Sequence, residues 1–257
     1  MTHSNATVTS STHGAVTTIL LNRPERLNTI TIPMMQRLRD ALEVAEASGA
    51  RAVILTATGK GFCAGQNLEN LAATHKHHAP TVLGSIIAEH YNPVIECIHH
   101  LTIPVIAAVQ GVAAGGGFYL ALACDFRIAA KSARFVPGLA KLGLVPCLGG
   151  SRALVDAVGY ARAMELALAT DEISAANAHA IGLVNRCVDD DQLLPTARAL
   201  ADRICALLQK SVGLTKRMLR QASADASGPT PKSEAWMQSI AASEPEHAER
   251  VRQFLSR

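Results

Sequence analysis

Aromatic residues, paired cysteines and clustered charge are all scarce in this chain of 257 residues. Only 4% of the residues are aromatic, and the net charge of +3 comes from dispersed lysines and arginines without a basic stripe. Nucleic-acid binding usually depends on such a stripe and on aromatic side chains that stack against bases. The composition therefore predicts no nucleic-acid partner, although a few exposed arginines are enough to bind an anionic small molecule.

The six cysteines are widely spaced and include no C-x-x-C pair. Several lie in apolar runs, a pattern typical of reduced, buried thiols rather than of a disulfide framework or a zinc site. The first fourteen residues, MTHSNATVTSSTHG, are polar, so we expect a loose leader without a signal peptide. These observations predict a soluble cytoplasmic protein.

Charge is also absent from residues 101–124. This stretch is long enough to span a membrane, but a proline, a glutamine and four glycines interrupt it, so we expect no membrane segment. It predicts instead a buried strand at 104–109, a turn at Gly115-Gly116-Gly117 and a packed helix at 117–124. Such a turn can bring backbone N–H groups close to a ligand, because no Cβ intervenes and the first donors of a helix are unpaired. Half of an anion-stabilising site and a purely structural turn both fit the pattern.

A second turn of small residues, GKGFCAGQNL at 59–68, follows a predicted strand at 52–56. Its glycines again allow backbone donors to face a cleft. The preceding pattern predicts a strand at 15–21 and a helix at 33–48 with its apolar side chains on one face. Strands and helices alternate up to about residue 200 and only helical patterns follow, which is typical of an α/β core with a helical tail.

Three polar features have ordinary explanations beside functional ones. The segment HKHH at 75–78 offers imidazoles, but a surface loop is preferred over a metal site because no carboxylate pairs with it at helix spacing. His90 adjoins a helix interruption at Tyr91-Asn92-Pro93 and could face a substrate, although solvated or core histidines are commoner. Asp125, at a helix-to-strand junction, is best explained by structural hydrogen bonds.

Two motifs, FCAGQNL and PVIAAVQGVAAGGGFYLALACDFRIAA, occur in this order with one strand–helix unit between them. With KLGLVPCLGG, GYARAMELALATDEISAANAHAIGLVNRCV and the closing QFLSR, they resemble the crotonase, or enoyl-CoA hydratase/isomerase, superfamily over about residues 13–257. YNP, GFCAGQ and KLGLVP look most similar to its phenylacetate-pathway ring-isomerising branch.

The resemblance implies an α/β fold. Residues 1–200 would form a spiral core of ββα turns with two nearly perpendicular sheets and a CoA-thioester site, and residues 201–257 a helical C-terminal trimerisation region. It further implies a homotrimer or homohexamer that acts on an acyl-CoA and needs no cofactor beyond the CoA of its substrate.

The resemblance also implies that the backbone N–H groups of Gln66 and Gly116 form an oxyanion hole for the thioester carbonyl. A thioester enolate carries negative charge on oxygen, and fixed donors in a dry site stabilise it by several kcal/mol. The residues that the resemblance assigns to the CoA adenine and pantetheine are the loop Arg26-Leu27-Asn28 and the strip Ala64 to Leu68, which includes Gln66, Asn67 and Leu68 itself.

The chain departs from the family at its acid/base positions. Hydratases of this type activate water with two glutamates, and the matching positions here hold Tyr119 and Leu139. Isomerases and dehalogenases place an aspartate where this chain has Cys147. A thiol has an ordinary pKa of about 8.5 and moves a proton only if its surroundings shift that value toward neutrality. Cys147 is therefore either a catalytic thiol or an inert pocket residue, while Tyr119 is better explained by core packing.

Three functions stay open on this evidence. The preferred one is double-bond isomerisation of an acyl-CoA through an enolate held by Gln66 and Gly116. The first alternative is decarboxylation of a malonyl-type CoA thioester, because the loss of carbon dioxide generates the enolate without a base. The second is a non-catalytic CoA-ester binding protein, since chemistry belongs to the site rather than to the fold.

Overall fold

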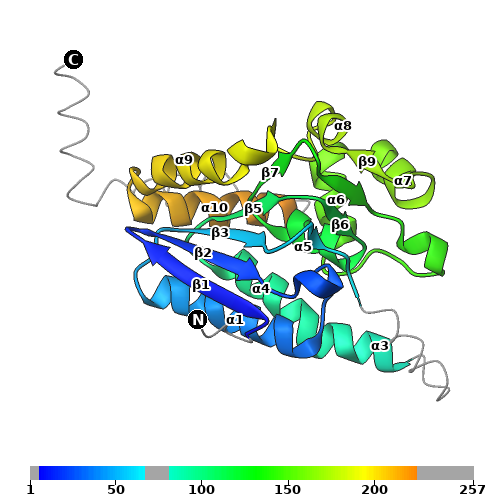
Figure 1. Ribbon diagram of the computed structural model, residues 1–257, viewed down its shortest axis with the longest axis horizontal. Coiled ribbons are helices and arrows are strands. Elements are labelled where there is room, and N and C mark those ends of the chain that lie inside the picture. The colour runs from blue at the N-terminus through cyan, green and yellow to red at the C-terminus, as the bar shows by residue number, and fades with distance from the viewer. Residues whose placement is uncertain (1–5, 67–80, 225–257) are drawn as a thin grey trace.

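The computed structural model describes residues 6–66 and 81–224, which fold into two β-sheets covered by helices (Figure 1). The strand order of the larger sheet is β1-β2-β3-β5-β7-β10, and all its neighbouring pairs are parallel except β1 with β2. Its strands are β1 (Val8–His13), β2 (Val16–Leu21), β3 (Ala52–Ala57), β5 (Val105–Val109), β7 (Phe126–Ala130) and β10 (Arg186–Val188).

Strand β1 corrects the expectation of a loose leader. Residues Val8–His13 pair antiparallel with β2, and the chain turns at Gly14, whose φ of 60° glycine adopts without strain. Most side chains of β1 are exposed, because it is an edge strand. A polar edge strand lacks the apolar alternation by which strands are recognised in a sequence.

The smaller sheet runs in the order β4-β6-β8-β9. Its strands are β4 (Gly61–Cys63), β6 (Val112–Ala114), β8 (Arg134–Val136) and β9 (Ile173–Ser174). Three times along the chain a strand of the larger sheet is followed directly by a strand of the smaller one: β3 by β4, β5 by β6 and β7 by β8. With the intervening helices, this repetition confirms the predicted ββα core.

Helices cover both faces of the larger sheet, α1 (Ile32–Ala47) and α4 (Asn92–His100) on one side and α9 (Leu193–Cys205) on the other (Figure 1). Successive strand residues alternate between the two cores: Leu55 packs into the core with α1, whereas Ile54 and Ile106 pack against α9. This alternation follows from the period-two geometry of a strand. The predicted boundary at residue 200 thus falls inside a helix that covers the sheet.

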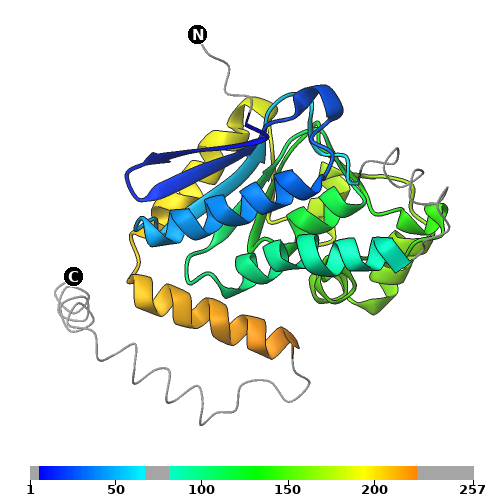
Figure 2. The ribbon, with the colours of Figure 1, turned by 90° about the horizontal axis from the view of Figure 1, so that it is seen from below.

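Helix α10 (Gln209–Ala224) is the next element, and it runs beside α4 (Figure 2). The remaining elements are η1 (Pro24–Arg26), α3 (Thr81–Ile86), a π-helical turn (Ile87–Tyr91), α5 (Gly116–Ala123), η3 (Leu139–Leu142), α6 (Gly150–Val158), α7 (Tyr160–Leu168), α8 (Ala175–Ala180) and η4 (Asp190–Gln192). Of the predicted tail at 201–257, residues 225–257 lie outside the described part. Within the described segments, no helix combines the length and apolar character needed to cross a membrane.

Candidate active site

The two glycine turns predicted from the sequence lie directly against each other. Gly65 has a φ of 84° and Gly115 a φ of 49°, both in the left-handed region that favours glycine. A Cβ added to Gly65 would lie 2.6 Å from the carbonyl oxygen of Ala114 and 3.2 Å from the amide nitrogen of Gly116. Only glycine at position 65 therefore allows the two turns to approach so closely.

One N–H group at each turn, that of Gln66 and that of Gly116, is not used by the fold. Ile30 forms an isolated parallel bridge with Gln66, in which the N–H of Ile30 donates to the carbonyl of Gly65 at 2.7 Å. This pairing leaves the N–H of Gln66 on the side away from Ile30. Gly116 opens α5, where helix donors are unpaired and carry partial positive charge. Among the described residues, neither N–H has an acceptor.

Gln66 and Gly116 line one cavity of about 670 Å³, which we call the glycine-turn cavity. Its walls come from the two turns, from α3 and the π-helical turn, and from the segment between β8 and α6. None of the described lining residues is acidic, basic or a histidine. The lining residues with polar side chains are Gln66, Tyr91, Asn92 and Cys147.

The residues expected to bind CoA are only partly gathered at this cavity. Ala64 and Gln66 line it, whereas Arg26 and Leu27 lie on the neighbouring exposed loop and are not among the lining residues. The carbonyl of Leu27 accepts a hydrogen bond from the N–H of Ala64 at 2.9 Å, which joins the loop to the cavity edge. Asn67 and Leu68 lie outside the described residues.

The side chain of Asn28 has a structural role within the expected CoA-binding loop. The residue is fully buried with a φ of 54°. Its Oδ1 accepts from the N–H of Arg23 at 2.7 Å, and its Nδ2 donates to the carbonyls of Thr58 and Gly61, both at 2.9 Å. Both amide donors are thus consumed, so Asn28 fixes the loop beside β4 and has none left for CoA.

Tyr119 packs in the core, as the sequence indicated. It is buried, and its hydroxyl donates to the carbonyl of Pro137 at 3.4 Å. Its ring leaves no space for a side chain at Gly150, where a Cβ would lie 2.0 Å from a ring carbon. Burial, and then the nearby Cys147, raise the pKa of Tyr119 to about 12. Leu139, at the other position where hydratases have glutamate, is an apolar residue of the cavity wall.

Cys147 lies on the cavity wall, but its pKa shifts in the wrong direction for a base. Burial raises the pKa of the thiol to about 11. The side chain is therefore un-ionised at neutral pH, which removes the condition under which a thiolate would accept a proton. Its position fits the catalytic hypothesis, whereas its protonation state argues against general-base chemistry.

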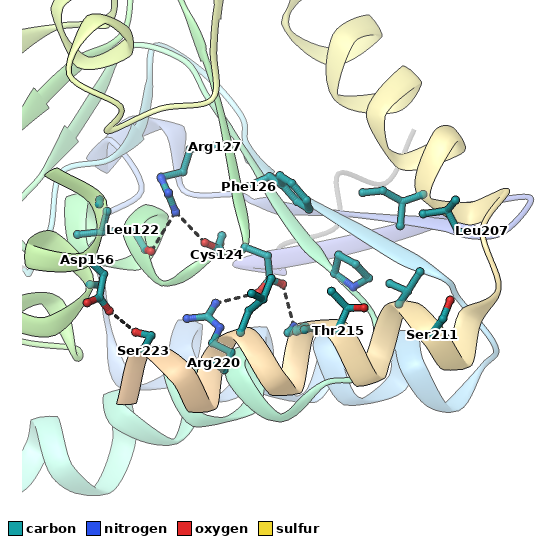
Figure 3. A pocket seen from close by; sticks show the side chains of 18 residues that line it. Leu122, Cys124, Phe126, Arg127, Asp156, Leu207, Ser211, Thr215, Arg220 and Ser223 are labelled. Carbon is teal, nitrogen blue, oxygen red and sulfur yellow. Dashed lines mark hydrogen bonds and ion pairs between the residues drawn. The ribbon is translucent and has the colours of Figure 1, made fainter. Parts of the chain in front are cut away.

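Asp125 lines a second cavity of about 520 Å³ between α10, α9 and β7, which we call the α10 cavity (Figure 3). Its carboxylate accepts from the N–H of Val105 and pairs with Lys216 and Arg220, each at 2.8 Å. Lys216 is only 8% exposed and also donates to two backbone carbonyls. This network ties α10 to the sheet, so the structural interpretation of Asp125 is confirmed.

His90 and the HKHH segment are the remaining candidates. His90 is half-buried and is not among the residues that line either cavity. The HKHH segment lies outside the described residues. Within the described ranges, no three side chains of histidine, cysteine, aspartate or glutamate lie close enough together to hold a metal ion.

Comparisons with known proteins agree with this geometry. The model of the family described as Enoyl-CoA hydratase/isomerase matches residues 11–257. The chain is 41% identical over 216 residues to the 1,2-epoxyphenylacetyl-CoA isomerase of Escherichia coli K12, an alignment that covers 84% of this chain and 82% of that protein.

Solved structures are similar over nearly the whole chain. An enoyl-CoA hydratase from Polaromonas sp. JS666 superposes with a TM-score of 0.90 at 33% identity, covering 97% of this chain and 96% of that one. A monofunctional enoyl-CoA isomerase from M. smegmatis has a TM-score of 0.74 at 35% identity, with 89% and 98% covered. Hydratases and isomerases thus share this fold, and the residues of the site must distinguish between them.

Proposed function

Because the chain belongs to the enoyl-CoA hydratase/isomerase, or crotonase, family of enzymes, we propose that it isomerises an acyl-CoA whose enolate is held by the N–H groups of Gln66 and Gly116. One observation carries this proposal: two unpaired amides open onto a cavity whose described lining has no charged side chain. Hydration needs carboxylates to activate water, and Tyr119 and Leu139 replace them. Isomerisation adds nothing to the substrate and needs no activated water.

The two amides stabilise charge that develops during the reaction. As the thioester oxygen becomes negative, its hydrogen bonds to both N–H groups strengthen, and one such donor contributes about 3–4 kcal/mol to the transition state. The N-terminus of α5 adds its partial positive charge on the Gly116 side. Apolar walls exclude water and so increase the strength of these interactions.

The substrate must rearrange easily, because the described lining has no ionised base. Cys147 keeps its proton at neutral pH, and no carboxylate or imidazole lies among the lining residues. A ring epoxide meets this requirement, because its expansion to a seven-membered oxygen-containing ring breaks the C–C bond of the epoxide by shifting electron pairs within the ring and moves no proton. The printed name of the E. coli relative describes an isomerase of such a ring ester.

Decarboxylation of a malonyl-type thioester is the second candidate, and the same observation favours it. Loss of carbon dioxide produces the enolate directly, so the oxyanion hole is sufficient and a base is unnecessary. Both reactions use Gln66 and Gly116 in the same way. The substrate alone distinguishes them.

The deciding experiment offers the purified protein a panel of ring-epoxide, dienoyl, enoyl and malonyl-type CoA esters. Isomerisation changes absorbance at constant mass, hydration adds one water, and decarboxylation releases carbon dioxide, so mass spectrometry separates the three. We expect isomerisation of the ring or dienoyl ester. Tight binding of several esters by calorimetry without turnover of any would instead establish a non-catalytic CoA-ester binding protein.

The assembly and the CoA contacts belong to the same proposal. We propose that residues 201–257 join subunits into a trimer or hexamer, supported by Leu207 and Leu219, which are 51% and 66% exposed in the single chain. Light scattering of the protein tests this.

We further propose that Arg26, Leu27, Ala64, Gln66, Asn67 and Leu68 contact CoA and that no other cofactor is needed.

A further inference from the structure

A π-helical turn brings one tyrosine to the wall of the glycine-turn cavity. Residues Ile87–Tyr91 form this turn, and it closes with the N–H of Asn92 donating to the carbonyl of Ile87. Pro93 follows, and proline disfavours a regular helical turn because it lacks an N–H and clashes with the carbonyl four residues earlier. Single π-helical turns inside helices are frequent at functional sites. Here the turn ends at Tyr91, which lines the cavity.

Tyr91 lines the cavity and has an unpaired hydroxyl. The residue is only 5% exposed, and among the described residues its hydroxyl has no hydrogen-bond partner. This hydroxyl is not fully enclosed by protein. The fully enclosed side-chain atoms without a partner belong to Thr7, Arg51 and His99, and Tyr91 is not among them. A buried phenol that lines a cavity, and is neither bonded nor enclosed, is available to a ligand that fills that cavity.

This hydroxyl is a donor at neutral pH. Burial, and then the neighbouring Cys147, raise the pKa of Tyr91 above its ordinary value, so the phenol keeps its proton. Most of the wall around it is apolar, including Ile87 and Leu148. Tyr119 offers a contrast within the same chain, because its hydroxyl already donates to the carbonyl of Pro137.

We infer that Tyr91 donates a hydrogen bond to an oxygen atom on the acyl group, an inference that rests on the proposed function. Oxygen-bearing ring acyl-CoA esters are then the preferred substrate class. A hydrocarbon acyl group would displace water and leave the phenol unpaired, and leaving a buried donor unpaired weakens binding. An epoxide or hydroxyl oxygen on the acyl group satisfies it. The amides thus bind the thioester oxygen, and Tyr91 selects for a second oxygen.

The test compares two ligands that differ by one oxygen, phenylacetyl-CoA and 3-hydroxyphenylacetyl-CoA, whose hydroxyl cannot reach its own thioester. Their dissociation constants are measured by calorimetry on the full chain. We expect the unmodified protein to bind the hydroxylated ester about tenfold more tightly, as one hydrogen bond of about 1.4 kcal/mol would give. In Tyr91→Phe the two constants should become equal.

Tyr119→Phe is the matched control, since it deletes the same atom from a buried tyrosine that does not line the cavity. It should keep the tenfold preference. Thermal unfolding checks that both variants fold, and Tyr91→Met provides a second way to remove the hydroxyl. A preference that persists in Tyr91→Phe, or that is absent from the unmodified protein, overturns the inference while leaving the oxyanion hole intact. If neither ester binds at all, the proposed function fails with it.

Discussion

Two cavities in this chain contrast in what they do with polar groups. The α10 cavity, drawn in Figure 3, is lined by five charged residues, Asp125, Arg127, Asp156, Lys216 and Arg220. The described lining of the glycine-turn cavity has none. The charges of the α10 cavity already have partners: Asp125 pairs with Lys216 and Arg220, Arg127 donates to backbone carbonyls, and Asp156 pairs with Arg152 and accepts from the hydroxyl of Ser223. The glycine-turn cavity has uncharged but unpaired N–H groups. The proposed site therefore lies where polar groups are unpaired, rather than where formal charges are concentrated.

Removing the central carboxylate of the α10 cavity should have the largest effect. Asp125→Ala leaves the buried ammonium of Lys216 without its counter-ion and should lower the free energy of unfolding by about 3–5 kcal/mol. Urea unfolding at constant protein concentration measures this. Glu43→Ala is the control, because its pair with the partly exposed Arg39 lies within α1, away from α10, and is worth at most about 1 kcal/mol. Equal losses in the two variants would show that the network does not hold α10.

In the glycine-turn cavity the corresponding change removes a backbone donor. Gly116→Pro deletes the N–H at the first position of α5, where proline is well tolerated, and should lower kcat by about 100- to 1000-fold. Steady-state kinetics on the substrate found in the ester panel measures the loss.

Gly116→Ala is the matched control for this change. It keeps the N–H and adds a Cβ about 3.0 Å from Cδ1 of Ile30, the movable end of a side chain, so most activity should remain. If both variants lose activity equally, crowding explains the loss, and the amide has no special role.

A pH experiment probes the histidine beside the α10 network. Burial, and then Arg220, lower the pKa of His99 to about 4, and its Nε2 has no partner among the described residues. The pKa of His99 in the folded protein lies below its unfolded value of about 6.5, so protonation of His99 favours the unfolded state. The free energy of unfolding is therefore unaffected by His99 above pH 6.5 and decreases as the pH falls toward 4. Between pH 7 and pH 5 we expect a loss of about 2 kcal/mol in unfolding free energy. In His99→Gln this loss of about 2 kcal/mol should disappear. An unchanged pH dependence of the unfolding free energy would show that His99 is not the titrating group.

The smallest expected effect concerns Cys147. Since burial holds its pKa near 11, Cys147→Ala should change kcat by less than about threefold, whereas removing a general base typically costs 100-fold or more. The pH–rate profile of the unmodified protein between pH 7 and 9 should likewise show no rise that Cys147→Ala abolishes. A loss of 100-fold would restore the thiol as the proton carrier.

Sequence reasoning worked best where a residue's role depends on its own backbone. Gly65, Gly115 and Gly116 stand out because the lack of a Cβ can be read from the residue type alone. Roles that depend on distant partners could not be predicted. The structural hydrogen bonds of the Asn28 side chain to Thr58 and Gly61 cross to another segment, so no local pattern indicates them.

The sequence by itself determined the alternation of strands and helices, the two glycine turns and the absence of the family's acidic residues, because each is a property of local pattern or residue type. Only the tertiary structure decided that both turns open onto one cavity, that burial keeps Cys147 protonated, and that Tyr91 has an unpaired hydroxyl while Tyr119 does not. The physical reason is that burial, pKa and hydrogen-bond satisfaction depend on neighbours brought together from distant parts of the chain.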